Sequence, residues 1–327
     1  MLEVSNEVQG NNDSMTESVT DPFDVARLRT GFSPGARILV TGAGGLLGRV
    51  LIERLIECDN VRLITAVDPR LRRPEGGISY GKVRYISERI QDCAPRFLSE
   101  RFDTIFHFGE FARIAESFIQ PETVLENNIS ATIAIAGLWR RMNCVLCFAA
   151  SSSEFSGLKG AVAEDIALSP YTLSKSFGSS LVRSFGHWFD LRFKCIYFYN
   201  VYGALPEEEA DGTVVSEYLR ARKNGAPLRV SLPGTQRRVF THVADAVDGV
   251  FFALSEGRFG DFHVGSSEAL SLLELAEIFD GDVEFVEAPI SIRDVADVFR
   301  PDLLPVGWKA KRNLRDFVLS IIFQDSA

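Results

Sequence analysis

The sequence has few of the residues that form cross-links or metal sites, and it has no long apolar run. Its 327 residues include five cysteines and four histidines. Cys144 and Cys147 have CxxC spacing, but no second pair accompanies them and their segment, CVLCFAA, is typical of a strand. We therefore interpret them as buried thiols and expect no metal site. No stretch approaches the ~18 apolar residues of a membrane-spanning helix, so we expect no membrane association.

Positive charge is also scarce. Lysine and arginine total 35 against 44 aspartate and glutamate residues, which gives a net charge of −9. This balance argues against nucleic acid or an anionic membrane surface as a partner. The opening segment, MLEVSNEVQGNNDSMTESV, lacks the basic start and apolar stretch of a secretory signal. Together with the low cysteine content, this favours a cytoplasmic protein.

Apolar runs alternate with helical patterns over residues 34–200. Candidate strands cover 37–40, 61–68, 82–86, 103–108, 143–150 and 194–199, and long helical patterns cover 121–141 and 171–189. This alternation predicts an α/β fold, a Rossmann-type doubly wound parallel sheet, with a hydrophobic content of 46% that suffices for its core. Shorter elements over 201–327 indicate a smaller C-terminal α/β substrate lobe, from which 236–266 returns to the first domain. The polar residues 1–33 are expected to be a disordered tail.

A glycine loop, TGAGGLLG at 41–48, separates the first candidate strand from a helical pattern. Glycines in such a loop allow a tight turn and close approach of a pyrophosphate to the helix N-terminus. Asp68 ends the next strand, where a carboxylate binds the ribose diol of NAD and repels the 2′-phosphate of NADP. NAD is therefore favoured, although Arg70, Arg72 and Arg73 keep NADP open.

Tyr171 and Lys175 lie four residues apart, which places both on one face of a helix. A nearby ammonium lowers the pKa of a tyrosine from ~10 toward the working range of a base. A serine from the cluster at 151–153 can hold the substrate oxygen. These groups and the glycine loop predict hydride transfer at an alcohol carbon. The expected cofactor contacts are Gly42, Gly45, Leu46, Leu47, Gly48, Asp68 and Lys175.

These motifs resemble the extended short-chain dehydrogenase/reductase family, specifically its nucleotide-sugar epimerases and dehydratases, from about Gly35 to Phe317. The block HFGEFARIAESFIQPETVLENNISAT at 107–132 is similar, without a gap, to the fourth strand and following helix of UDP-glucose 4-epimerases. The resemblance implies that Ser152 is the catalytic serine. It also implies that Asn200 of NVYG and Arg238 of GTQRRVF bind the diphosphate of a nucleotide sugar. By a looser alignment, Arg293 is the second phosphate-binding arginine.

Some positions depart from the family pattern. Arg89 stands where the resemblance implies an aspartate that binds adenine, so adenine is held in another way. Ser153 replaces the aspartate that 4,6-dehydratases use to expel water, which counts against dehydration. The pair Ser153-Glu154 matches the UDP-glucuronate decarboxylases, but the segment that precedes Tyr171 is shorter than theirs.

The sequence therefore favours an NAD-dependent epimerase that acts at C4 of a nucleotide-diphosphate sugar through a 4-keto intermediate, with Glu154 near the sugar. A decarboxylase, a 4,6-dehydratase or a 4-keto reductase of the same family remains an alternative. A protein that binds NAD and nucleotide sugar without turnover is an alternative of a different class.

The two long helical patterns also predict a homodimer, because each is too apolar to face water all round. The family resemblance implies the same assembly, with two helices from each subunit. The expected stripes are Leu125, Ile129, Ile133 and Ala136 on the first helix, and Leu173, Phe177, Leu181 and Phe185 on the second.

Overall fold

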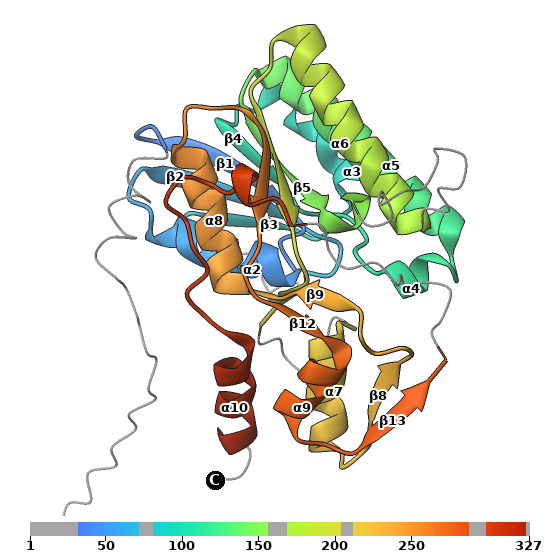
Figure 1. Cartoon of the computed structure of the whole chain (residues 1–327). Helices are drawn as coiled ribbons and strands as arrows, with labels where there is room; N and C mark the ends of the chain where they lie inside the picture. Colours follow the sequence, from blue (N-terminus) through green and yellow to red (C-terminus); the bar gives the residue numbers. More distant parts are fainter. Residues whose placement is uncertain (1–31, 72–80, 156–168, 204–211, 288–298, 325–327) are drawn as a thin grey trace, which may run out of the picture.

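A computed structural model of the chain describes residues 32–71, 81–155, 169–203, 212–287 and 299–324. Its centre is a seven-stranded sheet in the order β11-β6-β5-β4-β1-β2-β3, in which every neighbouring pair is parallel (Figure 1). The strands are β1 (Ala36–Thr41), β2 (Val61–Val67), β3 (Val83–Ile86), β4 (Thr104–His107), β5 (Val145–Ser151), β6 (Phe193–Phe198) and β11 (Gly260–Val264). The predicted doubly wound parallel sheet is thus confirmed.

Helices cover both faces of this sheet (Figure 1). On one face lie α2 (Leu46–Glu57) and α8 (Val243–Ser255), and on the other α3 (Ile90–Cys93), α5 (Pro121–Met142) and α6 (Pro170–Phe189). Each face has its own cluster of buried apolar side chains. Because both faces are covered, the strands are nearly continuous apolar runs, as in VLCFAAS of β5.

A smaller lobe follows β6 and has a separate apolar cluster (Figure 1). It contains α7 (Val214–Lys223), α9 (Leu272–Phe279) and α10 (Leu314–Gln324). Strands β8 (Leu228–Ser231) and β13 (Val283–Val286) pair in parallel, whereas β9 (Arg237–Val239) and β12 (Ala269–Ser271) pair antiparallel. The chain passes from β9 through α8 back to the large sheet at β11. The remaining short elements are β7 (Val201–Tyr202), β10 (Thr241–His242), α4 (Ile114–Ser117), and the 3-10 turns η1 (Ala94–Ser99), η2 (Ser152–Phe155) and η4 (Pro301–Leu303).

The packed structure includes a residue that the expected tail contained. Phe32 is buried, and its ring meets that of Phe251 edge to face at 6.3 Å between centroids. The side-chain amide of Asn60 also donates to the carbonyl oxygen of Phe32 at 2.9 Å. Phe32 therefore packs on the folded domain, although it lies inside the expected tail of residues 1–33. Residues 1–31 lie outside the described residues.

Candidate active site

The glycine loop lies at the carboxyl end of β1, where the order of the sheet reverses between β1 and β4. Gly42 has φ 73°, and a Cβ there would lie 2.5 Å from the carbonyl group of Phe108. A Cβ on Gly48 would lie 2.1 Å from the carbonyl oxygen of Gly42. Gly45 caps α2 without a side-chain hydrogen bond. The backbone N–H groups of Leu46 and Leu47 lie in the first turn of α2, where the pyrophosphate of a dinucleotide could accept from them.

Asp68 directly follows β2 and is buried beneath this loop. One carboxylate oxygen accepts from the backbone N–H of Gly44 at 3.2 Å, and the other from that of Arg70 at 2.8 Å. The Arg70 guanidinium also donates to both oxygens at 3.2 Å, although its side chain is 66% exposed. The carboxylate expected to bind a ribose therefore already has a cationic partner. Arg72 and Arg73 lie outside the described residues.

Tyr171 and Lys175 lie on the first turns of α6. This helix begins at Pro170, and the hydroxyl of Ser169 caps it by accepting from the N–H of Thr172 at 3.0 Å. Both side chains are buried, and the Lys175 ammonium lies 6.0 Å from the centroid of the Tyr171 ring. The Lys175 ammonium also donates to the carbonyl oxygen of Ala149 at 2.7 Å, which brings α6 to the carboxyl end of β5.

The Lys175 ammonium forms a buried ion pair with Glu110, which follows β4. Glu110 also accepts from the hydroxyl of Thr132 at 2.6 Å and lies 3.6 Å from Nε2 of His107. The sequence reasoning missed Glu110. A signal was present, since HFGE places a carboxylate just beyond the carboxyl end of an apolar strand, next to the glycine loop.

The charges of this cluster set the pKa values of its members. Burial opposes ionisation of Glu110, but Lys175 and His107 outweigh it and lower the pKa of Glu110 to about 2. Burial likewise opposes the charge of Lys175, but Glu110 and Tyr171 raise the pKa of Lys175 above its usual value. Burial raises the pKa of Tyr171, and Glu110 and Glu154 add to the rise. Lys175 lowers the Tyr171 pKa, as expected, but it does not outweigh burial.

The serine cluster differs from the expectation in one respect. A hydrogen bond to Tyr171 comes from the side chain of Ser151 and lowers the pKa of Tyr171. The hydroxyl of Ser151 also lies 2.9 Å from that of Ser153. Ser152 is buried in the turn η2, and its hydroxyl has no hydrogen-bond partner among the described residues. The role of Ser152 therefore stays a prediction.

Glu154 lies in the same turn and is held by the protein. Its carboxylate accepts from the hydroxyl of Ser179 on α6 at 2.6 Å and from the N–H of Ser151 at 3.3 Å. Burial raises the pKa of Glu154, and these hydrogen bonds oppose the rise. Its contacts thus tie η2 to α6.

The residues expected to bind the diphosphate lie where the small lobe meets the large sheet. Asn200 is exposed just beyond β6, and its side-chain amide donates to the carbonyl oxygen of Val239 at 2.9 Å. Arg238 directly precedes Val239 on β9 and is half-buried. The structure therefore brings Asn200 beside the strand of Arg238. Arg293 lies outside the described residues. Arg89 is the N-cap of α3, and its exposed guanidinium pairs with Asp92 at 3.5 Å.

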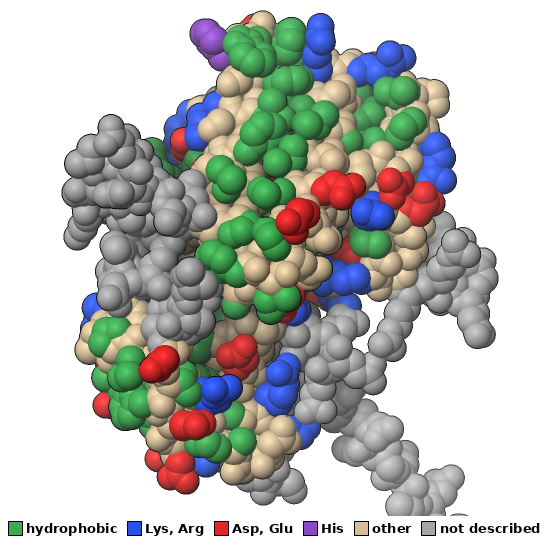
Figure 2. Space-filling view, turned by 90° about the vertical axis from the view of Figure 1, so that its right-hand side faces the viewer, with side chains coloured by type: hydrophobic (Ala, Val, Ile, Leu, Met, Phe, Trp, Pro, Cys, Tyr) green, Lys and Arg blue, Asp and Glu red, His purple; other side chains and the backbone are tan. Residues whose placement is uncertain are grey.

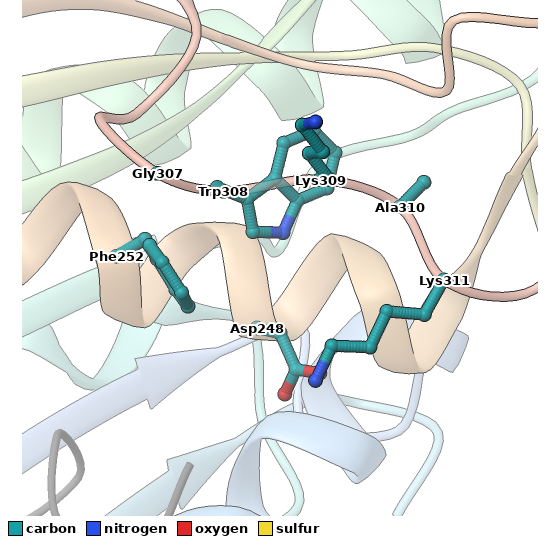
Figure 3. Close-up of a pocket in the computed structure, with 7 residues that line it drawn as sticks. All are labelled: Asp248, Phe252, Gly307, Trp308, Lys309, Ala310 and Lys311. Atoms are coloured by element: carbon teal, nitrogen blue, oxygen red, sulfur yellow. The ribbon is translucent and has the colours of Figure 1, made fainter. Parts of the chain in front are cut away.

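A pocket of about 360 Å³ lies elsewhere, between α8 and the segment 307–311 (Figure 3). Its lining contains none of the residues described above, and Figure 3 shows the side chains of Asp248 and Lys311 pointing toward each other at one end. Within the part of the chain that the structure describes, no cluster of three histidine, cysteine or acidic side chains could hold a metal ion. None of the helices described there is long and apolar enough to cross a membrane.

Sequence relatives include several enzymes of nucleotide-sugar metabolism. UDP-glucuronic acid decarboxylase 6 of Arabidopsis thaliana is 24% identical over 306 residues, which cover 87% of each chain. An uncharacterized UDP-glucose epimerase, YtcB, of Bacillus subtilis is 25% identical over 79% of this chain and 85% of its own length. The chain matches epimerases and decarboxylases at similar identity, so these relatives do not distinguish between the two reactions.

Solved structures of similar fold cover almost the same length. UDP-glucose 4-epimerase from Thermotoga maritima, solved with UDP-glucose, superposes with a TM-score of 0.76 at 18% identity, over 89% of this chain and 99% of the other. UDP-glucuronic acid 4-epimerase from Bacillus cereus, in complex with UDP-glucuronic acid and NAD, gives a TM-score of 0.75 at 21% identity, over 88% and 99%. The model of the NAD dependent epimerase/dehydratase family matches residues 38–265. The glycine loop, the Tyr171–Lys175 pair and this match together show that the chain belongs to the NAD dependent epimerase/dehydratase family.

Proposed function

We propose that this protein is an NAD-dependent epimerase that inverts C4 of a nucleotide-diphosphate sugar through a 4-keto intermediate. The observation that carries the proposal is the position of Tyr171 and Lys175, side by side on α6 at the same edge of the sheet as the glycine loop. A base beside a dinucleotide cradle is what hydride transfer at an alcohol carbon requires.

In this proposal, Lys175 stabilises Tyr171 as the phenolate. The phenolate takes the proton of the C4 hydroxyl and becomes the neutral phenol. Ser152, beyond β5, donates a hydrogen bond to the same substrate oxygen. Bound NAD supplies a reversible hydride acceptor. Inversion requires the ketosugar to rotate while its diphosphate stays bound. We propose that Asn200, Arg238 and Arg293 bind the diphosphate. No net oxidation results.

Asp68 supports NAD rather than NADP as the cofactor. Its buried carboxylate lies against the glycine loop, where an added Cβ on Gly44 would be 3.2 Å from it. A carboxylate at this place suits a free ribose diol and repels a phosphate. The neighbouring Arg70 weakens this discrimination, because its charge compensates the carboxylate.

Decarboxylation of a nucleotide-linked uronic acid is the second candidate. Ser153-Glu154 favours it, and so do the names of several relatives. Against it, the Glu154 carboxylate is only partly exposed and already accepts hydrogen bonds from Ser179 and Ser151. A side chain held in this way is poorly available as an acid or base for the sugar. The same contacts, and the absence of an aspartate at position 153, disfavour a 4,6-dehydratase.

The experiment has two stages. Nucleotides released from the purified protein are identified by mass spectrometry, and the protein is then incubated with a panel of nucleotide sugars. Chromatography and proton NMR of the products should reveal an inverted C4 centre without accumulation of NADH. Carbon dioxide released from UDP-glucuronate, or a stable 4-keto-6-deoxy product, contradicts the proposed reaction.

We also propose a homodimer through α5 and α6. Most of the expected stripe residues are at least partly exposed, and Ile133, Leu173 and Phe177 are strongly exposed. Ala136 is an exception, because it is buried within the subunit. Figure 2 displays the apolar side chains that extend over this face. Two such faces related by a twofold axis would cover each other. Light scattering that gives a monomer at micromolar concentration would count against this assembly.

A cytoplasmic location is part of the proposal. All five cysteines are free and buried, and burial raises the pKa of Cys144 and of Cys147 to about 12. Unreactive thiols of this kind suit a reducing compartment. The interpretation of Cys144 and Cys147 as buried thiols is confirmed.

A further inference from the structure

Glu110 connects the glycine loop to the Lys175 ammonium. The residue before it, Gly109, donates its backbone N–H to the hydroxyl of Thr41 at 3.0 Å, and a Cβ on Gly109 would lie 2.7 Å from the backbone nitrogen of Gly42. Glu110 thus leaves a segment packed on the loop and reaches across to α6. Its side chain is only 1% exposed and that of Lys175 5% exposed.

The described residues accept only two of the three N–H donors of the Lys175 ammonium, which leaves one for a ligand. An ammonium has three N–H donors. Among the described residues, the carboxylate of Glu110 and the carbonyl oxygen of Ala149 accept two of them. The third is left for a group that these residues do not supply. A hydroxyl of the nicotinamide ribose is a suitable acceptor, and it would share the ammonium with Glu110.

Stability alone does not account for a buried ion pair here. The loss of hydration of two buried charges largely cancels their attraction, and an apolar pair of the same volume is often as stable. The pair also lies at the carboxyl edge of the sheet, next to Tyr171, where its charges act on the phenol. A role in the electrostatics of the base is therefore the better explanation.

We propose that Glu110 is a positioning residue for Lys175. It fixes the ammonium between β4 and β5, with one donor left for the cofactor, and it compensates part of the positive charge that acts on the Tyr171 phenol. The inference rests on the proposed function in taking Tyr171 as the base. The groups that face this cluster are His107 from β4, Glu154 from η2, and Tyr171 and Lys175 from α6, while Arg183 acts on Glu154.

The direction of the effect follows from the charges. The Glu110 carboxylate raises the pKa of Tyr171, whereas Lys175 lowers it. A Glu110→Gln substitution removes the negative charge and keeps an oxygen that can accept from Lys175. The ionisation of Tyr171 should therefore move to lower pH. A residue that served only packing would leave that ionisation unchanged.

The test needs no substrate. Tyrosinate absorbance is titrated in the wild type and in Glu110→Gln, and in each background the Tyr171→Phe variant is subtracted to isolate Tyr171 from the other six of the seven tyrosines. Glu126→Gln is the matched control, because it removes an exposed carboxylate from α5. We expect a shift to lower pH in Glu110→Gln and none in Glu126→Gln. No shift, an upward shift, or an equal shift in the control overturns the proposal.

A second measurement covers the case in which Glu110→Gln does not fold. In a crystal structure of the wild type with NAD, the Lys175 ammonium should lie within hydrogen-bond distance of both the Glu110 carboxylate and a ribose hydroxyl. An ammonium that has turned away from Glu110 overturns the proposal. If the epimerase assay detects no turnover, the Tyr171 titration and the crystal structure with NAD still test the role of Glu110. Turnover with an unshifted Tyr171 titration would reject only the role of Glu110.

Discussion

Two charged pairs flank the proposed cofactor site, and they differ in burial. The side chains of Lys175 and Glu110, beside Tyr171, are 5% and 1% exposed. Those of Asp68 and Arg70, at the proposed adenosine end, are 4% and 66% exposed. Charges buried on both sides interact strongly, because little water screens them. An arginine that is mostly exposed gains little from its partner and can move aside. The first pair is therefore part of the folded core, and the second can exchange its partner for a ligand.

The largest expected effect separates chemistry from binding at the buried end. Tyr171→Phe removes the phenol oxygen and keeps the ring packed, so turnover should fall by about 10²–10⁴-fold, the usual contribution of a general base. Binding of NAD, measured by calorimetry, should change little. If the variant keeps most of its activity with any accepted substrate, another group is the base.

The difference between the pairs can be measured as stability. Lys175→Met leaves the Glu110 carboxylate buried and unpaired, which should cost about 3–5 kcal/mol of unfolding free energy. At the exposed pair, Arg70→Met should change stability by at most about 1 kcal/mol. Urea unfolding of both variants gives the comparison, and the double variant Lys175→Met/Glu110→Gln is the control.

That double variant should recover much of the loss, because replacing both partners removes the unpaired charge. If Lys175→Met and Arg70→Met cost the same, burial does not distinguish the two pairs. A lower rate and a weaker affinity for NAD should accompany any loss of Lys175, since the ammonium serves both the base and the cofactor.

The buried pair also predicts how stability depends on pH. The pKa of Glu110 is lowered from 4.5 to about 2, so its contribution is complete above about 4.5 and is lost as the pH falls toward 2. That shift corresponds to about 3 kcal/mol. The pKa of Lys175 is raised, so its contribution is complete below its usual value and is lost only at more alkaline pH.

Two buried histidines make the stability of the protein depend on pH in a second, higher range. Burial lowers the pKa of His242 and of His263 from 6.5 to about 4, so the stability that depends on their neutral forms declines between those values. Urea unfolding across this acid range should reveal both phases. In Glu110→Gln the lower phase should be lost and the histidine phase kept. If the lower phase persists in Glu110→Gln, other carboxylates cause it.

The sequence was sufficient to predict the parallel sheet and the helix that carries Tyr171 and Lys175. Buried strands appear as apolar runs, and the spacing of Tyr171 and Lys175 is a local property of one helix. Glu110 escaped notice because its partner is 65 residues away in the chain. The raised pKa of Tyr171 depends on burial, which helical spacing does not reveal. The choice between Ser151 and Ser152 depends on how the chain turns from β5 into η2.

The smallest expected effect concerns the exposed pair and the choice of cofactor. Asp68→Ala removes the carboxylate that suits a ribose diol and repels a 2′-phosphate, so NAD binding should weaken more than NADP binding. The loss of one charge-assisted hydrogen bond is worth about 1.5–3 kcal/mol, or roughly tenfold to a hundredfold in affinity. Calorimetry with both cofactors measures the ratio of affinities.

Arg70→Ala is the matched variant, because it removes the partner and leaves Asp68 held by the backbone N–H groups of Gly44 and Arg70. Without the guanidinium, the carboxylate is uncompensated and should repel a phosphate more strongly. The preference for NAD should therefore rise in Arg70→Ala and fall in Asp68→Ala. If both variants shift the ratio in the same direction, the two side chains do not oppose each other in selecting the cofactor. Tighter binding of NADP than NAD by the wild type would reverse the assignment and make Arg70 the dominant group at this end of the site.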